Sequence, residues 1–323
     1  MFFTLLLSSF LTFVELNCEN LFDTRHDSLK NDMEFLPEGT YKWTPTRYWH
    51  KVNAIAQEII ALGDPKLKTE EPVEKAKRRW TLPDFIALCE VENDSTMTDL
   101  TKRSLLRNAG YEYVMTDSPD QRGIDVALLY RPSSCKLISS HSIRVKDMPY
   151  PTRDILYANG VVASGDTLHI FVVHAPSRRG GELASRPNRL RVASQLGAAV
   201  DSVYALNNQA KILITGDFND YYDSPALDSL YKHRLTNVSS HAVGQNGAKG
   251  TYRYHGEWNS LDQMICSPAL TDKLKDCRVG DLKFLLEEDE KYGGVKPFRT
   301  YLGPKYKQGY SDHLPLVARF KLK

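Results

Sequence analysis

The chain has 323 residues, of which 41% are hydrophobic, 25% are charged and 10% are aromatic. This composition is typical of a globular protein with a sizeable core, and it excludes a disordered or collagen-like chain. The formal net charge of +2 at pH 7 gives no strong electrostatic footprint for nucleic acid.

The chain begins with an apolar segment, residues 1–9, that contains no lysine or arginine. It therefore lacks the positive start of a secretory signal, and it is too short for a transmembrane helix followed by a separate strand. Two interpretations remain, an extension of the first strand or the remnant of an export signal. The apolar start favours export, to the periplasm or the cell exterior, over a cytoplasmic location. Residues 10–323 are predicted to form a single domain.

The first predicted strand covers residues 13–22, and its period of two places Asn17 and Glu19 on one face. A helix is predicted to follow from Thr44-Pro45, because threonine caps helices and proline suits the first turn. Residues 64–80 carry charges of both signs, which is typical of a solvated loop.

An apolar run at residues 85–93 ends in acids, among them Glu90. A second helix is predicted from 188 to 207, where apolar residues recur near one stripe. The remaining strands are predicted at 111–116, 125–131, 136–145, 154–163, 167–173, 211–215, 261–266 and 315–322.

Polar residues stand at the ends of several of these strands. The strand at 167–173 ends at His174, and the strand at 211–215 runs into Gly216-Asp217-Phe218-Asn219. A tight turn would also explain glycine, aspartate and asparagine here. A site at the strand tips is favoured because other predicted strands also carry acids, amides or imidazoles at or beside their ends. Asp220, which follows the motif, is interpreted as a turn residue.

The C-terminal part adds an acid inside a strand-like segment, Asp262, and the triplet Ser311-Asp312-His313 before the last strand. Between them, residues 287–310 interleave aromatic residues with lysine and arginine, which fits either a wall of a substrate cleft or a packed loop. The five cysteines are scattered without metal-site spacing, and they are predicted to be buried small hydrophobic residues.

In this order and at these intervals, the polar residues resemble the endonuclease/exonuclease/phosphatase superfamily from residue 10 to the C-terminus. The most specific pieces are Gly216 to Asn219 and Ser311 to His313. The resemblance implies an α/β (α+β) fold, a four-layer α/β/β/α sandwich in which two mixed sheets pack face to face with helices outside. It also implies metal-dependent hydrolysis of phosphate esters, whereas it leaves the substrate open.

The resemblance further implies roles for the polar residues. Mg²⁺, for which Mn²⁺ can substitute, prefers oxygen ligands. Its expected ligands are Glu90, Glu19, Asn17 and Asp312. Asp217 is expected to activate water, Asn219 to stabilise developing charge, and His313, paired with Asp262, to hold the phosphate. His174 is either a structural histidine or a contact to the phosphate or the leaving group.

Several arginines follow His174 along the chain. They form either a solvated start of the second helix or a clamp for additional phosphates. The residues expected to bind substrate are Arg178, Arg179, Arg186 and Arg299.

The leading hypothesis is a monomeric Mg²⁺-dependent phosphodiesterase that acts on a phosphate ester. The favoured form of this hypothesis is a nuclease, whose partner would be nucleic acid. The alternative is a phosphomonoesterase or phospholipase-type enzyme acting on a phosphorylated small molecule or lipid headgroup. A binding module that has lost catalysis is disfavoured, because every expected catalytic position carries a competent side chain.

Overall fold

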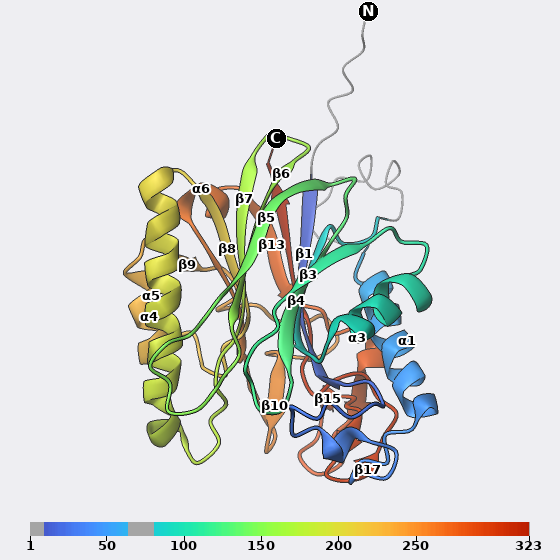
Figure 1. Cartoon of the computed structure of the whole chain (residues 1–323). Helices are drawn as coiled ribbons and strands as arrows, with labels where there is room; N and C mark the ends of the chain where they lie inside the picture. Colours follow the sequence, from blue (N-terminus) through green and yellow to red (C-terminus); the bar gives the residue numbers. More distant parts are fainter. Residues whose placement is uncertain (1–9, 64–80, 323) are drawn as a thin grey trace, which may run out of the picture.

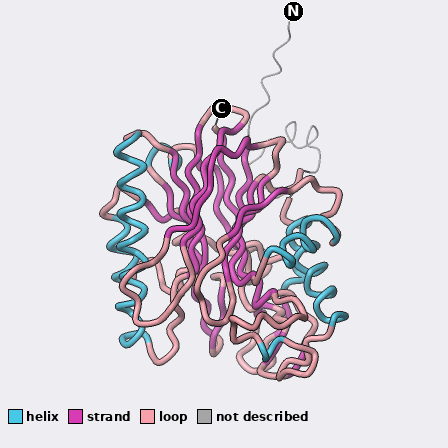
Figure 2. Tube along the Cα trace, in the orientation of Figure 1, coloured by secondary structure: helices cyan, strands magenta, loops and turns pink. Residues whose placement is uncertain are grey.

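The computed structural model describes residues 10–63 and 81–322. Two six-stranded mixed sheets lie face to face at the centre, and helices cover both outer sides (Figure 1 and Figure 2). The four-layer sandwich expected from the resemblance is therefore confirmed. The predictions made for residues 1–9 and 64–80 lie outside the described residues.

The first sheet is built from β1 (Phe10–Leu21), β2 (Phe85–Val91), β3 (Glu112–Met115), β4 (Asp125–Tyr130), β13 (Leu274–Val279) and β18 (Leu316–Lys321). Its strand order is β13-β18-β1-β2-β4-β3. Strands β1 and β2 are parallel neighbours, and the other pairs are antiparallel.

The second sheet is built from β5 (Cys135–Ile143), β6 (Ile155–Val162), β7 (Thr167–His174), β8 (Lys211–Asp217), β9 (Thr236–Asn237) and β12 (Asp262–Cys266). Its strand order is β5-β6-β7-β8-β12-β9, with β7 and β8 as parallel neighbours. Each sheet thus has a parallel pair near its centre.

Figure 1 shows α4 and α5 outside the second sheet and α1 and α3 outside the first. The helices are α1 (Pro45–Ala61), α3 (Asp94–Thr98), α4 (Glu182–Leu206), α5 (Pro225–Tyr231) and α6 (Pro268–Thr271), with short helical turns η1 (Met33–Phe35), η2 (Asp99–Arg103) and η3 (Lys283–Leu285). Three small hairpins pair β10 (Tyr252–Tyr254) with β11 (Glu257–Asn259), β14 (Leu286–Glu288) with β15 (Val295–Pro297), and β16 (Tyr301–Leu302) with β17 (Lys305–Tyr306). None of the described helices has the length and apolar composition needed to cross a membrane.

The alternation of side chains along β2 shows how the sequence builds these layers. Phe85 and Ala87 belong to the core between the two sheets, whereas Ile86 and Leu88 pack on the opposite side, toward α1. A strand with both faces buried is apolar throughout, as β2 is until its last residues. Each fully buried side chain of this size contributes about 1.5–3 kcal/mol relative to exposure.

The predicted strands are confirmed to within a few residues at their ends, and so is the first helix, where the Thr44 side chain accepts a hydrogen bond from Arg47 N. The second helix was predicted too short, because it begins at Glu182 and includes Pro187. Pro187 lies beyond the first turn, where its missing N–H removes one backbone hydrogen bond of the helix. The first turn is held by side chains as well, since Ser185 Oγ donates to Gly181 O at 2.8 Å.

Six strand ends meet at one edge of the sandwich, the lower edge in Figure 1. The two parallel pairs, β1 with β2 and β7 with β8, end there. Strands β12 and β18 begin there, because they run antiparallel to β8 and β1. The polar residues found at strand ends in the sequence are therefore gathered at one place.

Candidate active site

A cavity of about 910 Å³ opens at this edge of the sandwich. Its acids are Glu34, Glu90, Asp217 and Asp312, its arginines are Arg122, Arg153, Arg178 and Arg179, and its imidazoles are His174 and His313. A hollow of this size lined by opposite charges suits a large, anionic ligand.

Glu90 reaches the cavity through an irregularity at the end of β2. The pairing of β2 with β4 passes from Cys89 to Val91 and leaves Glu90 unpaired, with a φ of 62°. Such a bulge redirects a side chain that regular alternation would point elsewhere. One carboxylate oxygen, Oε2, accepts a hydrogen bond from Asn20 N at 2.9 Å.

Asp217 ends β8 directly opposite His174 of β7. The preceding Gly216 has a φ of 139°, and a Cβ there would lie 1.9 Å from Val173 O, so the position admits only glycine. Asp217 Oδ1 accepts from Asn219 N at 2.8 Å, and Oδ2 accepts from Asn17 Nδ2 at 3.1 Å. These donors fix the orientation of the carboxylate.

The electrostatic surroundings of Asp217 disfavour its charged form. Burial and the neighbouring Asp262 carboxylate raise the pKa of Asp217 to about 7, although His313 partly offsets them. A carboxyl group with a pKa near neutrality can both take up and release a proton at physiological pH.

The expected contact between Asp262 and His313 is present, with 2.8 Å between Asp262 Oδ2 and His313 Nδ1. Burial alone would lower the pKa of His313, but the carboxylates of Asp262, Asp217 and Asp312 raise it well above its ordinary value. The imidazole is therefore protonated at neutral pH. Ser311 Oγ, which accepts from His313 N at 3.1 Å and donates to Asn17 O at 2.6 Å, ties this segment to β1.

His174 has the opposite electrostatic surroundings. Burial and the nearby Arg153 and Arg122 hold the pKa of His174 well below its ordinary value, so the ring is neutral. Its Nε2 lies 3.6 Å from Asp217 Oδ2 and 3.9 Å from Glu90 Oε1. His174 thus stands between the two carboxylates, where it can act as a hydrogen-bond donor but not as a fixed positive charge.

Glu19 does not line the cavity, and this differs from the expectation of a metal ligand. Its φ of 46° breaks the strand alternation that was to place it beside Asn17. Glu19 Oε2 accepts from Thr300 N at 2.6 Å, and Oε1 accepts from Arg299 Nε at 3.2 Å. Arg299 also donates to Asp312 Oδ2 at 3.0 Å, so it links two carboxylates, and it lines a second hollow beside the cavity.

Asn17 is likewise absent from the cavity lining. Its amide oxygen accepts from Glu19 N at 2.9 Å, while its amide nitrogen donates to Asp217. Asn17 therefore joins β1 of the first sheet to β8 of the second. In this arrangement it positions Asp217.

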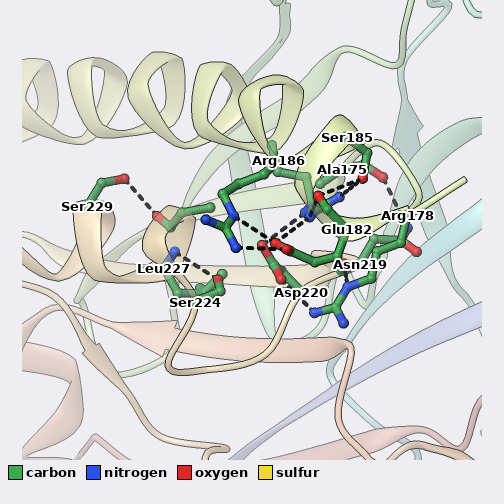
Figure 3. Close-up of polar contacts among 12 residues, drawn as sticks. Ala175, Arg178, Glu182, Ser185, Arg186, Asn219, Asp220, Ser224, Leu227 and Ser229 are labelled. Carbon is green, nitrogen blue, oxygen red and sulfur yellow. Dashed lines mark hydrogen bonds and ion pairs between the residues drawn. The ribbon is translucent and has the colours of Figure 1, made fainter. Parts of the chain in front are cut away.

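The interpretation of Asp220 as a simple turn residue is wrong. Asp220 is 1% exposed, and its two oxygens accept from Arg178 Nη2 at 2.6 Å and from Arg189 Nε at 2.9 Å (Figure 3). Arg178 also donates to Asn219 O at 3.0 Å and lies 3.9 Å from the centre of the Tyr221 ring. The start of α4 is thereby fastened to the tip of β8.

The predicted arginines separate into two groups. Arg178 and Arg179 line the cavity, whereas Arg186 does not; it forms a bidentate pair with Glu182, one turn earlier in α4. The interpretation as a helix start therefore describes Arg186, since i,i+4 pairs of this kind stabilise exposed helix surfaces. Arg178 and Arg179 remain candidates for binding phosphate.

The sequence did not point to Arg122 or Arg153, because they come from loops with no recognisable pattern. Arg153 donates to Asp120 Oδ2 at 3.2 Å and to Ala175 O at 2.9 Å, and Arg122 contacts the Asn20 side chain. Both guanidinium groups are thus anchored on one side while they line the cavity. Fixed arginines are well suited to bind phosphate or carboxylate.

Glu15 is a second residue that the sequence did not single out. It is fully buried on β1, on the same face as Asn17. Burial and the Asp262 and Asp217 carboxylates raise the pKa of Glu15 well above its ordinary value, so it is held as a neutral acid. An acid inside the apolar run Phe13 to Leu16 was the available signal.

The donors at the cavity fit a hard divalent cation. Glu90 and Asp312 bring carboxylate oxygens to the cavity, and Asp217 lies beside them. Asp217, Asp262 and His313 also offer ligand atoms within 4.8 Å of one another, all of them buried. In this group His313 Nδ1 is already bonded to Asp262 Oδ2.

Comparison with known proteins agrees with this geometry. The sequence model of the Endonuclease/Exonuclease/phosphatase family matches residues 12–321. No curated protein matches the chain in a sequence search.

Similar solved structures include proteins from two organisms. An endonuclease/exonuclease/phosphatase family protein from Bacteroides thetaiotaomicron is 15% identical, with a TM-score of 0.58 over 96% of this chain and 97% of that chain. A mannosyl-6-phosphatase from the same organism is 16% identical, with a TM-score of 0.59 over 95% and 98%. Truncated TDP2 from Caenorhabditis elegans is 16% identical, with a TM-score of 0.56 over 97% of each chain. At these identities the likeness shows a shared fold.

Proposed function

The chain belongs to the endonuclease/exonuclease/phosphatase family of phosphoesterases, and on this premise we propose that it is a divalent-metal-dependent phosphodiesterase acting on nucleic acid. The observation that carries the proposal is the composition of the cavity. An acid able to take a proton, Asp217, and an imidazolium, His313, open onto the same space as four arginines.

Glu90 and Asp312 are the residues that we propose hold the metal ion, with Asn17 acting through water. When bound, Mg²⁺ would supply positive charge beside the phosphate oxygens. Glu19, whose oxygens are already engaged by Arg299 and Thr300, supports Asp312 through Arg299 instead of binding the ion directly.

Asp217 is proposed to take the proton of the attacking water. Its pKa of about 7 lies near the pH at which it would act, which is where a general base is most effective. Asn219 orients it, because the Asn219 amide nitrogen lies 3.3 Å from Asp217 Oδ2 and 3.1 Å from Ala175 O. Asn219 can donate to the phosphate only when the longer of these bonds opens.

His313 is proposed to hold the scissile phosphate as a cation, since its protonated ring faces the cavity and Asp262 fixes its orientation. Neutral His174 would donate a hydrogen bond to the phosphate or to the leaving oxygen. Arg153 and Arg178 are paired with Asp120 and Asp220, which leaves the charges of Arg122 and Arg179 to bind phosphates beside the scissile one. We therefore favour a diester that is flanked by further phosphates.

The test is hydrolysis by the purified protein with Mg²⁺ of plasmid DNA, abasic oligonucleotide, RNA, inositol phosphates, sphingomyelin and mannose 6-phosphate. We expect cleavage of nucleic acid, with an affinity that falls steeply as salt rises, by about 0.7–0.9 in log K per log salt for each phosphate contact. Arg179→Gln should reduce this slope, whereas Arg191→Gln, outside the cavity, should not. Turnover confined to phosphomonoesters or sphingomyelin would refute the proposal.

A further inference from the structure

A second hollow of about 430 Å³ adjoins the catalytic cavity. The two share Tyr252, Tyr254 and Asp312 as lining residues, and none of the four cavity arginines lines the second hollow. Arg253 and Arg299 line the second hollow instead, together with the aromatic rings of Tyr254, His255 and Tyr292. The catalytic His313 lies next to their junction, because its ring centre is 4.9 Å from that of Tyr252.

The walls of the second hollow are two hairpins, β10–β11 and β14–β15. The first turns through His255 and Gly256, whose φ values of 49° and 86° are those of a type I′ turn, the preferred two-residue link between antiparallel strands. Its other end is attached to the active site by a β-bridge between Tyr252 and His313.

The two hairpins are fastened together by Arg253. Its guanidinium donates to Gly256 O at 3.1 Å in one hairpin, and to Gly293 O at 2.8 Å and Val295 O in the other. A Cβ at Gly256 would lie 2.9 Å from the Tyr292 ring, so the two turns are in contact. The aromatic residues at these turns are consequently held in place before any ligand binds.

Three rings at these turns form a row. The Tyr254 and His255 rings are 4.1 Å apart at 12°, and the His255 and Tyr292 rings are 6.2 Å apart at 24°. Although large apolar rings are normally covered, Tyr254 is 60% exposed and Tyr292 is 44% exposed. Preordered, exposed rings bind flat ligands at low entropic cost, and base stacking on such rings contributes about 1–3 kcal/mol per base.

Resting on the proposed function, we propose that the row Tyr254, His255 and Tyr292 is a stacking site for a nucleobase of the nucleotide attached to the scissile phosphate. Tyr254 lies two strand positions beyond Tyr252, about 6.6 Å along β10 by strand geometry. This is a reach that one nucleoside covers.

The charges in the hollow favour a base over a sugar. A sugar ring is normally held by acceptors, but Glu287 pairs with Lys307 at 2.9 Å, and Asp289 accepts from two backbone N–H groups of its own turn. Lys291 and Lys296 also line the hollow. Lys296 lies 3.9 Å from Glu287 and 3.8 Å from Asp289, which leaves Lys291 to oppose a cationic lipid headgroup and attract the next phosphate of a strand.

The experiment compares a DNA dinucleotide with analogues that lack the base on one side or the other of the phosphodiester. Tyr254→Ala should raise KM about tenfold on the dinucleotide, in line with a lost stacking contact, and leave kcat unchanged. On the analogue that lacks the stacked base, Tyr254→Ala should leave KM unchanged, because that analogue has no base to stack on the ring. Tyr254→Phe should keep the wild-type KM, and Tyr150→Ala, at a tyrosine that is 45% exposed and outside both hollows, should do the same.

Equal losses on the dinucleotide and on both base-free analogues would overturn the stacking site while leaving the phosphodiesterase proposal intact. If the wild-type protein cleaves no dinucleotide, binding of the dinucleotide can be measured directly by titration of the Asp217→Asn variant. Binding weakened by Tyr254→Ala would support the stacking site although the proposed activity had failed, and unchanged binding would refute it.

Discussion

Two buried ionic clusters stand side by side at the tip of β8. The catalytic cluster consists of Asp217, Asp262 and His313, and the anchor cluster consists of Asp220, Arg178 and Arg189. In the anchor cluster both carboxylate oxygens of Asp220 accept from arginine. In the catalytic cluster Asp262 Oδ1 has no fixed N–H donor among the described residues, and the acid group of Glu15 is hydrogen-bonded to Asp262 where the anchor cluster has arginine.

This difference indicates that the anchor cluster supports the structure and that the catalytic cluster takes part in the chemistry. A buried polar group normally has its hydrogen bonds filled by fixed donors, so a buried acid without them is a candidate for a chemical role. Filled capacity, as in the anchor cluster, indicates rigid support. The expected consequences differ, because damage to the catalytic cluster should lower turnover, whereas damage to the anchor cluster should lower stability and substrate affinity.

The largest effect is expected at the metal ligands, which test whether the catalytic side depends on an ion at all. Activity should vanish in EDTA and return with Mg²⁺ or Mn²⁺, and Glu90→Gln should remove most of it without a change in melting temperature. Exposed Glu112→Gln is the matched control. Full activity in excess chelator would end the metal assignment.

The next effect tests the anchor cluster. Asp220→Asn removes the closer carboxylate of the buried Arg189 and leaves only Glu182 at 3.4 Å, and breaking a buried ion pair in this way costs about 3–5 kcal/mol. We expect a corresponding loss in the free energy of unfolding, measured by denaturant titration, together with a higher KM. Asp223→Asn, an exposed aspartate three residues on, should be silent. An unchanged unfolding curve for Asp220→Asn would show that the cluster is dispensable.

At Asp217 we expect a large loss of kcat and no loss of stability. Asp217→Asn should lower kcat by about 10²-fold or more, as for a lost general base. It should not destabilise the protein, because burial raises the pKa of Asp217 to about 7 and thereby disfavours its charged form. The stability gained by the substitution should grow as pH rises from about 4 to 7. If Asp217→Asn lowered stability and left kcat unchanged, Asp217 would belong to the supporting structure and not to the catalytic machinery.

A finer test concerns coupling within the catalytic cluster. If Asp262 and His313 act as one unit, replacing both should lower kcat by a much smaller factor than the product of the two single-variant factors. Because Asp262 raises the pKa of His313, Asp262→Asn should also shift the loss of activity at high pH toward lower pH. Additive losses and an unmoved pH profile would show that the two residues act independently.

The layers of the fold could be predicted because long apolar strands and one long amphipathic helix carry clear periods. The site could be predicted only in part. Asp262 and His313 lie 51 positions apart and were paired through the family resemblance, which the hydrogen bond supports. The orientations of Glu19 and Glu90 could not be predicted from the strand period, because both residues have left-handed backbone conformations that interrupt the alternation.

Other parts of the site carried no pattern in the sequence. Arg122 and Arg153 reach the cavity from loops, so nothing in the neighbouring residues marks them. Asp220 was misinterpreted because it directly follows a catalytic motif, and only the packing of α4 against β8 reveals its partners. Contacts between distant segments decided each of these cases.

The position of β1 between β2 and β18 also has a consequence for synthesis. At ribosomal rates, the last strand emerges roughly 15–60 s after the first. Until then one edge of β1 is unpaired and apolar, the kind of edge that invites aggregation and calls for chaperones. His313 arrives equally late, so the nascent chain has no complete catalytic centre, and an active phosphoesterase is expected only once the C-terminal strand has closed the sheet.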